Sequence, residues 1–152
     1  MSRIAFFPGS FDPITKGHED IVRRAIPMYD EIIVALGVNS SKNYMFSFEQ
    51  RFKWIEDTFK DCTNIKVISY EGLTIDACKK HNAKFILRGL RNSNDYEYEK
   101  SIAMMNQALA LDIETVYLNT RPELSAISST IIRDIIKNQG DSAAFLASGV
   151  QL

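Results

Sequence analysis

The sequence has few of the residues that build metal centres and disulfide frameworks. Its 152 residues include two cysteines, Cys62 and Cys78, and two histidines, and neither cysteine belongs to a C-x-x-C pair. This scarcity excludes a zinc-finger arrangement and a disulfide-stapled scaffold. We expect both thiols to be reduced, as in a cytoplasmic protein, and no cluster of candidate metal ligands stands out.

Long apolar runs and an excess of positive charge are also missing. No stretch approaches the about 20 apolar residues of a membrane span, and the first residues lack the apolar core of a signal peptide. Lys and Arg total 18 against 19 Asp and Glu, which gives a formal net charge of −1. Neither a membrane nor a nucleic acid, which is bound through many basic contacts, is therefore an expected partner. A small anion is compatible with this charge.

Repeats and low-complexity segments are absent, and the composition is that of an ordinary globular domain. Hydrophobic residues make up 45% of the chain and charged residues 24%. A chain of this length buries about two-thirds of its unfolded surface in one core, without a metal or a disulfide to hold it. We therefore expect a single domain over residues 1–152.

Short apolar runs suited to buried parallel strands recur five times, at 3–7, 31–38, 64–70, 84–87 and 114–118. Helical patterns fill the gaps, one after His18, one after the capping pair Ser47 and Gln50, and others at 73–81, 95–111 and 128–138. This alternation predicts an α/β fold, with a Rossmann-like, doubly wound parallel five-stranded sheet and helices on both faces. Pro27 should end or kink the first helix.

Two other segments give weaker expectations. Met104 and Met105 share apolar stripes with Ile102 and Leu109, which favours a place in the core or in the lining of a pocket. Residues 140–152 carry only a short apolar cluster around Phe145, which predicts a short helix or a frayed tail.

A loop reading Pro8-Gly9-Ser10-Phe11-Asp12-Pro13 leads to Thr15-Lys16-Gly17-His18. Its Pro and Gly predict that the first strand ends at Phe7 and that a helix begins near Gly17. A loop that feeds a helix start offers free N–H groups and the positive end of the helix dipole, which favour phosphate, and His18 can add an imidazole donor. The alternative interpretation is a helix cap with a surface histidine, and the tetrapeptide alone does not decide between them.

Basic residues gather where the predicted strands end. Lys42 follows the second run, Arg88 and Arg91 follow the fourth, and Arg133 lies in the last predicted helix. Because ligands of an open parallel sheet bind outside the carboxyl ends of its strands, these cations should share one rim and suit a polyphosphate plus a second anion. Each could instead be a solvated side chain, which for Lys42 alone is the favoured alternative. Arg88 fits that alternative less well, since it directly follows an apolar strand.

Three consecutive hydroxyl residues, Ser128, Ser129 and Thr130, precede the apolar pair Ile131-Ile132. They predict a helix start whose hydroxyls and free amides hold phosphate oxygens. Ordinary N-capping is the alternative, but it explains one hydroxyl better than three. Together with the loop before His18, this segment predicts a site for a nucleoside triphosphate.

The three segments 9–18, 88–91 with Tyr98-Glu99, and 127–133 resemble the signatures of the nucleotidylyltransferase superfamily, T/H-x-G-H and I-S-S-T-x-I-R. Within it, P-G-S-F-D-P-I-T-x-G-H, R-G-L-R and D-Y-E-Y-E are similar to the bacterial phosphopantetheine adenylyltransferases, over nearly the whole chain. The resemblance implies transfer of AMP from ATP to 4′-phosphopantetheine. The products would be dephospho-coenzyme A and pyrophosphate, in the penultimate step of coenzyme A biosynthesis.

The resemblance also implies roles for individual residues. The implied catalytic set is His18, which would stabilise the transition state at the α-phosphate, with Lys42, Arg88 and Arg91. The implied ATP-binding residues are Gly9, Ser10, Phe11, His18, Gly89, Leu90, Arg91, Glu99, Leu124, Ser125, Ala126, Ile127, Ser128, Ser129 and Thr130. The implied acceptor-binding residues are Ser10, Lys42, Thr74, Arg88 and Asn106. Thr74 stands where an aliphatic residue is usual, and Leu124 where an aromatic one is common.

The family likeness further implies Mg²⁺ with the triphosphate, assembly as a homohexamer, and inhibition by coenzyme A. The predicted chemistry is a direct in-line attack by the acceptor's phosphate on the α-phosphorus, without a covalent intermediate. Two alternatives remain open from the residues alone. One is another member of the superfamily that uses nicotinamide mononucleotide or a cytidylyl donor, and the other is a non-catalytic module that senses nucleotides.

Overall fold

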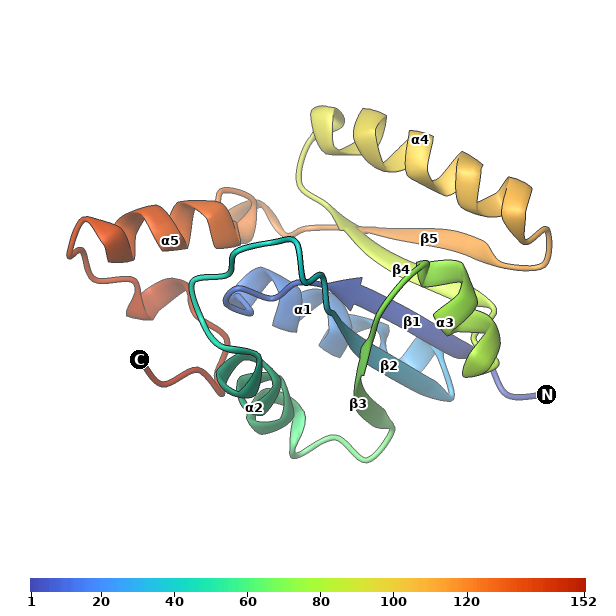
Figure 1. The fold of residues 1–152 in the computed structure, drawn as a ribbon, viewed down its shortest axis with the longest axis horizontal. Helices are drawn as coiled ribbons and strands as arrows, with labels where there is room; N and C mark the ends of the chain where they lie inside the picture. Colours follow the sequence, from blue (N-terminus) through green and yellow to red (C-terminus); the bar gives the residue numbers. More distant parts are fainter.

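The computed structural model describes all 152 residues and contains one parallel sheet of five strands in the order β3-β2-β1-β4-β5 (Figure 1). The strands are β1 (Ile4–Gly9), β2 (Glu31–Gly37), β3 (Ile65–Tyr70), β4 (Phe85–Leu90) and β5 (Glu114–Asn119). The helices are α1 (Lys16–Ala25), α2 (Phe48–Phe59), α3 (Thr74–Lys80), α4 (Ser93–Leu109) and α5 (Ser129–Lys137). The predicted Rossmann-like α/β fold is confirmed.

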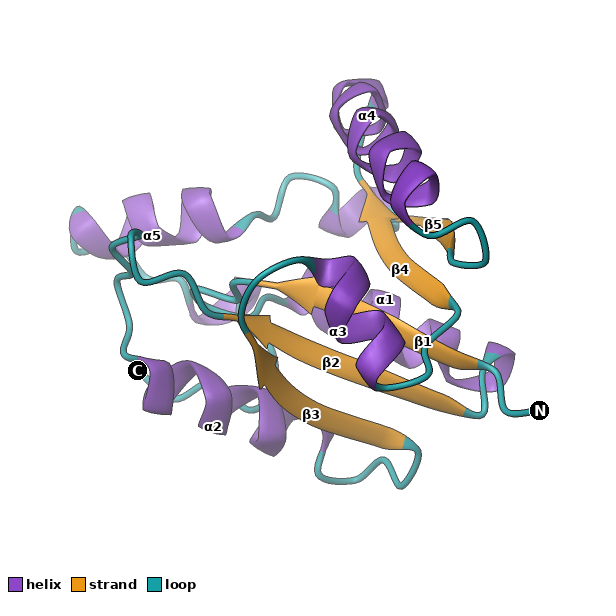
Figure 2. Ribbon diagram, turned by 45° about the vertical axis from the view of Figure 1, so that its right-hand side comes forward, coloured by secondary structure: helices purple, strands orange, loops and turns teal.

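Helices cover both faces of the sheet (Figure 2), and alternate residues of the central strands pack against the two faces. Ala5 and Phe7 of β1 pack in the cluster that holds the buried side chains of α1 and α2. Phe6, between them, packs in a second cluster with Ile75 and Cys78 of α3. This period of two follows from strand geometry, and it places helices on both faces as expected.

Two strands run further than the sequence indicates. β1 continues through Pro8 to Gly9, and β4 continues to Leu90, so the expected ends at Phe7 and Leu87 are wrong. Pro8 is accommodated because the ladder between β1 and β4 stops at the pair Phe6 and Ile86. The carbonyl of Pro8 faces β4, so its missing N–H falls where no ladder bond is required. β1 and β4 therefore part towards their carboxyl ends.

The helix starts follow the capping chemistry that the sequence indicates. Thr15 caps α1, and Ser47 with Gln50 forms the predicted capping box of α2. Pro27 ends α1 instead of kinking it, because the chain from Ile26 to Met28 tightens into a 3-10 turn. No helix is both long enough and apolar enough to cross a membrane.

The C-terminal segment contains a short helix at the apolar cluster, one of the two predicted outcomes, and it is not a frayed tail. After a 3-10 turn at Ala143–Phe145, Leu146 forms an isolated antiparallel bridge with Thr15. Ser148 then donates through its N–H and its hydroxyl to Glu19, both at 2.8 Å. The end of the chain thus holds the start of α1 in place.

The expected core position of Met104 and Met105 is wrong, although Met104 lines a cavity of about 220 Å³ between α4 and β5. Their relative exposures are 61% and 65%, and Ile102, Leu109 and Tyr98 of the same helix are exposed as well, at 41%, 55% and 70%. α4 lies over the β4 and β5 side of the sheet and buries only Glu99 (Figure 1). Sequence periodicity cannot separate an apolar stripe that faces the core from one that faces outward.

Candidate active site

Two cavities open where β1 and β4 part, at the point where the strand order reverses. One has a volume of about 350 Å³ and the other about 320 Å³. They share five lining residues, Pro8, Gly9, Ser10, Arg88 and Glu99. Such a switch point is where ligands bind in open α/β sheets.

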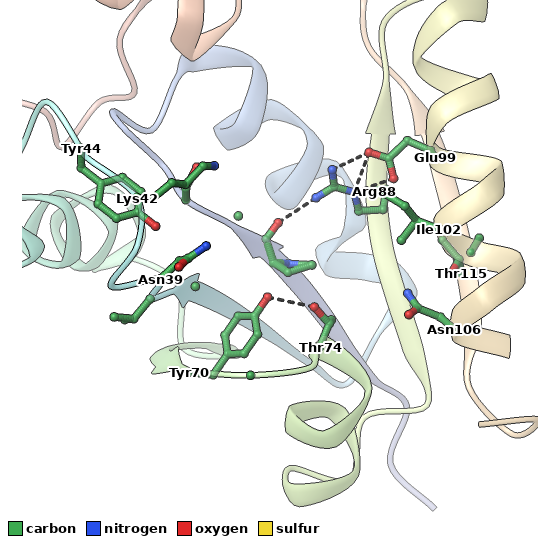
Figure 3. A pocket seen from close by; sticks show the side chains of 17 residues that line it. Asn39, Lys42, Tyr44, Tyr70, Thr74, Arg88, Glu99, Ile102, Asn106 and Thr115 are labelled. Carbon is green, nitrogen blue, oxygen red and sulfur yellow. Dashed lines mark hydrogen bonds and ion pairs between the residues drawn. The ribbon is translucent and has the colours of Figure 1, made fainter. Parts of the chain in front are cut away.

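The first cavity, here called the α3 cavity, lies between the 38–47 loop, α3 and α4 (Figure 3). Lys42 and Tyr44 form one side, and Ile102 and Asn106 of α4 form the opposite side. The rest of its side-chain lining includes the polar residues Asn39, Tyr70, Thr74 and Thr115 and the apolar Val38 and Ala103.

The second cavity, here called the α5 cavity, lies between the starts of α1 and α5. Its lining includes Gly17 and His18 from α1, the segment 127–130 that begins α5, and Arg91 and Asp95 after β4. Two helix N-termini therefore face one cavity, which is an arrangement that favours an anion.

The loop between β1 and α1 has a compact and unusual backbone. Phe11 is 2% exposed and has a φ of 44°, a left-handed conformation that is uncommon for a residue with a Cβ. Its ring lies against the backbone of Gly9, where a Cβ would come within 2.9 Å of the ring. Gly9 is therefore required by the packing of Phe11, and both residues line the α5 cavity.

His18 is fixed in one orientation by the capping box of α1. Its Nδ1 accepts a hydrogen bond from the Thr15 N–H at 3.0 Å, and Phe7 and Phe11 approach its ring edge-on. Burial, and then the charges of Arg88 and Arg91, lower the pKa of His18 to about 4. The imidazole is therefore neutral at physiological pH, and because Nδ1 accepts, Nε2 carries the proton and serves as a donor.

Arg88 occupies the boundary between the two cavities. Its guanidinium pairs with the Glu99 carboxylate at 2.5 Å and 3.0 Å, and its Nη1 donates to the Pro8 carbonyl at 2.9 Å. Glu99 is 9% exposed, whereas the Arg88 side chain keeps 33% of its surface exposed, so the carboxylate is the buried half of the pair. One arginine thus bridges the gap between β1 and β4 and presents its charge to both cavities.

Lys42 differs from the arginines because no carboxylate pairs with it. Arg91 pairs with Asp95 at 3.1 Å, and Arg133 approaches Asp12 at 4.0 Å. The Lys42 side chain is exposed and forms no ion pair or hydrogen bond within the chain. It is the mobile cation of the α3 cavity.

The chain matches the cytidylyltransferase-like family over residues 6–135. It is 56% identical over 150 residues to the phosphopantetheine adenylyltransferase of Flavobacterium psychrophilum, covering 99% of both chains, and 45% identical to that of Bacteroides thetaiotaomicron, again covering 99% of both. The chain belongs to the phosphopantetheine adenylyltransferase family. It is therefore an enzyme, which rules out the non-catalytic nucleotide-sensing module.

A solved structure supports the fold alone. The bifunctional NMN adenylyltransferase/ADP ribose pyrophosphatase from Francisella tularensis superposes with a TM-score of 0.74 at 20% identity, covering 98% of this chain and 46% of that one. The parallel sheet and its connections thus share the fold of that structure.

The two cavities bring together most of the residues that the family resemblance implies. All five implied acceptor-binding residues line the α3 cavity. Eleven of the fifteen implied ATP-binding residues line the α5 cavity; the four that do not are Leu90, Leu124, Ser125 and Ala126. Leu124 ends a 3-10 turn, Pro122–Leu124, that precedes the cavity wall.

The hydroxyls before α5 all have partners within the protein. Ser128 caps the helix by accepting from the Ile131 N–H at 3.1 Å, as expected. Ser129 donates to the Pro13 carbonyl at 2.8 Å, and Thr130 accepts from Arg133 at 3.3 Å. The three hydroxyls therefore have structural partners that the sequence pattern does not reveal. Ser129 ties α5 to the loop after β1, and the other two bond within the start of α5.

Sequence reasoning misses two residues that line or support the two cavities. Asp12 is 3% exposed and accepts from the N–H groups of Met45 and Phe46 at 2.9 Å and 3.0 Å. Tyr70 donates to or accepts from Thr74 at 3.0 Å in the α3 cavity. The only sequence signal for Asp12 is its place inside the P-G-S-F-D-P motif, and Tyr70 has none.

The chain does not provide a metal site of its own. No three His, Cys, Asp or Glu side chains lie close enough together to hold an ion. The two carboxylates that line the α5 cavity, Asp95 and Glu99, are both engaged by arginines. The donor set therefore does not fit a resident Mg²⁺ cage, since Mg²⁺ prefers free carboxylate oxygens or phosphates.

Proposed function

We propose that this enzyme transfers AMP from ATP to 4′-phosphopantetheine and releases dephospho-coenzyme A and pyrophosphate, the penultimate step of coenzyme A biosynthesis. The observation that carries the proposal is the pair of cavities meeting at Arg88. One is lined by two helix starts and suits a triphosphate, and the other has an unpaired lysine at its mouth and suits an anion with a long polar arm.

In this proposal ATP occupies the α5 cavity. Its phosphates lie against Gly9, Ser10 and Phe11 and the N-terminus of α1, with Arg91 close by. The segment 127–130 and Gly89 hold the nucleoside. Glu99 acts through Arg88, because its carboxylate is committed to that ion pair.

The acceptor occupies the α3 cavity with its phosphate towards Ser10, Lys42 and Arg88. Lys42 provides a free ammonium group and Arg88 a fixed guanidinium, so the phosphate meets one mobile and one rigid cation. Thr74 and Asn106 line the part of the cavity that would take the pantetheine arm.

The chemical step is an in-line displacement without a covalent intermediate. An oxygen of the acceptor's phosphate attacks the α-phosphorus, the bond to the bridging oxygen between α and β breaks, and pyrophosphate leaves with that oxygen. The nucleophile is already an anion, so no general base is needed, and the enzyme contributes position and charge stabilisation. His18, neutral and protonated at Nε2, donates a hydrogen bond to the α-phosphate as its charge shifts.

Mg²⁺ enters as part of the substrate, coordinated by the triphosphate of ATP. Since Asp95 and Glu99 are engaged by arginines, the protein would meet this ion mainly through water and the nucleotide. The protein's own cations then offset the remaining charge of the two anionic substrates.

The proposal includes assembly as a homohexamer in the cytoplasm and inhibition by coenzyme A. The exposed stripe of Tyr98, Ile102, Met105 and Leu109 on α4 supports association between copies, because its spacing of four, three and four residues is that of a helix-packing seam. Coenzyme A contains both an adenosine phosphate and a pantetheine arm, so it would fill both cavities at once.

The test is to incubate the purified protein with ATP, Mg²⁺ and 4′-phosphopantetheine and to detect dephospho-coenzyme A by mass spectrometry and pyrophosphate by a coupled assay. Parallel reactions with nicotinamide mononucleotide as acceptor and with CTP as donor distinguish other superfamily chemistries. Turnover with either alternative and none with 4′-phosphopantetheine would refute the assignment.

A further inference from the structure

Arg51, in the first turn of α2, is a buried cation that none of the family motifs includes. It is 3% exposed, and no carboxylate lies within ion-pair distance of its guanidinium. Nη1 donates to the Ser10 carbonyl at 2.9 Å, and Nε donates to the Phe46 carbonyl at 3.1 Å. The carboxylates of Asp12 and Glu49 act on this charge only from beyond ion-pair distance. A buried charge without a direct ion pair is costly, so its hydrogen bonds have to supply much of its stabilisation.

The contacts of Arg51 join two loops from different parts of the chain. Ser10 belongs to the loop after β1 and lines both cavities. The guanidinium also lies 3.9 Å from the centre of the Tyr44 ring, and Tyr44 lines the α3 cavity. A cation over an aromatic ring at this distance is attractive, and more so away from solvent. Arg51 thus contacts one cavity-lining residue from each of the two loops, Ser10 and Tyr44, and lies behind both of them.

The 38–47 loop begins at Val38, whose N–H donates to the Tyr70 carbonyl of β3 at 2.8 Å. The turn that carries Lys42, residues 39–42, has no comparable attachment. Its hydrogen bonds stay within the turn, from the Lys42 N–H to the Asn39 carbonyl at 3.1 Å and from Ser41 to Asn39. The other end is held by Arg51 and by Asp12, which accepts from Met45 and Phe46. The place of Lys42 relative to Ser10 is therefore set through residues 44–46.

We propose that Arg51 is a positioning residue that couples the loop of Ser10 to the loop of Lys42, so that the acceptor's phosphate is held in register with the α-phosphorus. The inference rests on the proposed function for its substrates. It goes beyond that function because Arg51 touches neither cavity and acts only through Ser10, Tyr44 and Phe46.

The main test is Arg51→Lys, which keeps the charge and loses the planar fork. We expect KM for 4′-phosphopantetheine to rise about tenfold, with KM for ATP changed by less than about twofold, since one lost contact of this kind is worth about a factor of ten. In a Lys42→Ala background the effect of Arg51→Lys should shrink to less than about twofold, because it acts through Lys42. Independent, multiplicative effects would overturn the inference.

The matched control is Arg23→Lys. Arg23 also joins elements, donating to the Thr58 carbonyl at 2.8 Å and lying over the Phe59 ring at 5.7 Å, but it touches neither substrate loop. The Arg23→Lys substitution should leave KM for the acceptor within about twofold of the wild-type value. An equal effect of both substitutions would show that Arg51 has only a general structural role.

A readout without turnover uses Trp54, the only tryptophan, which is 6% exposed and packs edge-on against Phe46 at 4.9 Å. Arg51→Lys should loosen residues 44–46 and raise acrylamide quenching of Trp54 at least about twofold, whereas Arg23→Lys should not. If Arg51→Lys does not fold, Asp12→Asn weakens the same junction and should give the same result. Unchanged quenching would refute the coupling, whatever acceptor the wild-type protein uses. If the wild-type protein formed no dephospho-coenzyme A, only the proposed function would be refuted.

Discussion

The α5 cavity and the α3 cavity differ in how far their polar groups are already paired. In the α5 cavity His18 is held by Thr15, Arg91 by Asp95, and the hydroxyls of 128–130 by neighbouring groups of the protein. In the α3 cavity Lys42 and the side-chain amide of Asn106 have no partner in the chain. The α5 cavity, which the proposed function gives to ATP, therefore has its polar groups paired in advance. The α3 cavity, proposed for the acceptor, leaves polar groups free for a ligand.

This difference has a physical consequence. Groups that are already oriented need little reorganisation when charge develops, which is the condition for electrostatic stabilisation of a transition state. Groups that are free lose conformational entropy on binding but adapt to a flexible substrate. Substitutions on the α5 side should therefore lower turnover, and substitutions on the α3 side should weaken acceptor binding.

The largest effect is expected from Arg88→Met, because Arg88 belongs to both cavities. kcat/KM should fall by about 10³ or more, and removal of the arginine leaves Glu99 as a buried, unpaired carboxylate, which should cost about 3 kcal/mol of stability. Denaturant unfolding and steady-state kinetics measure the two losses. The double variant Arg88→Met/Glu99→Gln should recover stability but not activity; recovery of both would show that Arg88 has no direct role.

His18→Ala tests the prepared α5 side. We expect kcat to fall by about 10² to 10³ while KM for the acceptor stays within a few-fold, since the lost donor acts in the transition state. Because His18 also forms part of the α1 cap, thermal unfolding should be measured alongside. A well-folded variant with kcat near that of wild type would remove His18 from the chemistry.

The titration of His18 predicts a pH dependence of stability. Its pKa falls from 6.5 to about 4 on folding, so the unfolded chain binds more protons between these values. The contribution to stability is present above pH 6.5 and is lost as the pH falls towards about 4, by at most about 3 kcal/mol. Urea unfolding of the wild type and of His18→Gln across this pH range isolates the contribution of His18 to the free energy of unfolding. If that free energy depended on pH in the same way in both proteins, the prediction would be contradicted.

Lys42→Ala tests the adaptable α3 side. KM for 4′-phosphopantetheine should rise about 10- to 100-fold, KM for ATP should stay nearly constant, and the melting temperature should not change, because Lys42 is exposed and unpaired. Lys60→Ala, at an exposed position beyond the end of α2, is the control for simple loss of charge. A fall in kcat with no change in KM would assign Lys42 to the transition state instead.

The fold was largely predictable because buried strands and capped helices leave local patterns. The five apolar runs, the Ser47 and Gln50 capping box and the stop at Pro27 follow from short-range chemistry. The ends of β1 and β4 were less predictable. Pro8 and Arg88 are residues that usually end a strand, and they fit here only because the two strands separate at this point. The core position expected for the methionines of α4 was wrong for a similar reason, because a sequence pattern does not show what covers an apolar helix face.

The site was predictable where a motif names the residues and not where tertiary contacts assign them. The rim of basic residues follows from strand order, yet the pairing of Arg88 with Glu99 and of Arg91 with Asp95 needs the placement of α4. Arg51 lies 41 residues from Ser10 in the chain, and nothing local to either residue predicts their contact. Long-range tertiary contacts of this kind are seen only in the three-dimensional structure.

The parting of β1 from β4 at Pro8 also affects how substrates arrive. If β1 and β4 could continue their ladder, further backbone hydrogen bonds would form between them in the empty enzyme, and a ligand would first have to break these hydrogen bonds. Pro8 has no N–H to offer on that side, and Arg88 already occupies its carbonyl, so the seam has no closed form to adopt. No hydrogen bond between β1 and β4 therefore has to break before a ligand enters either cavity.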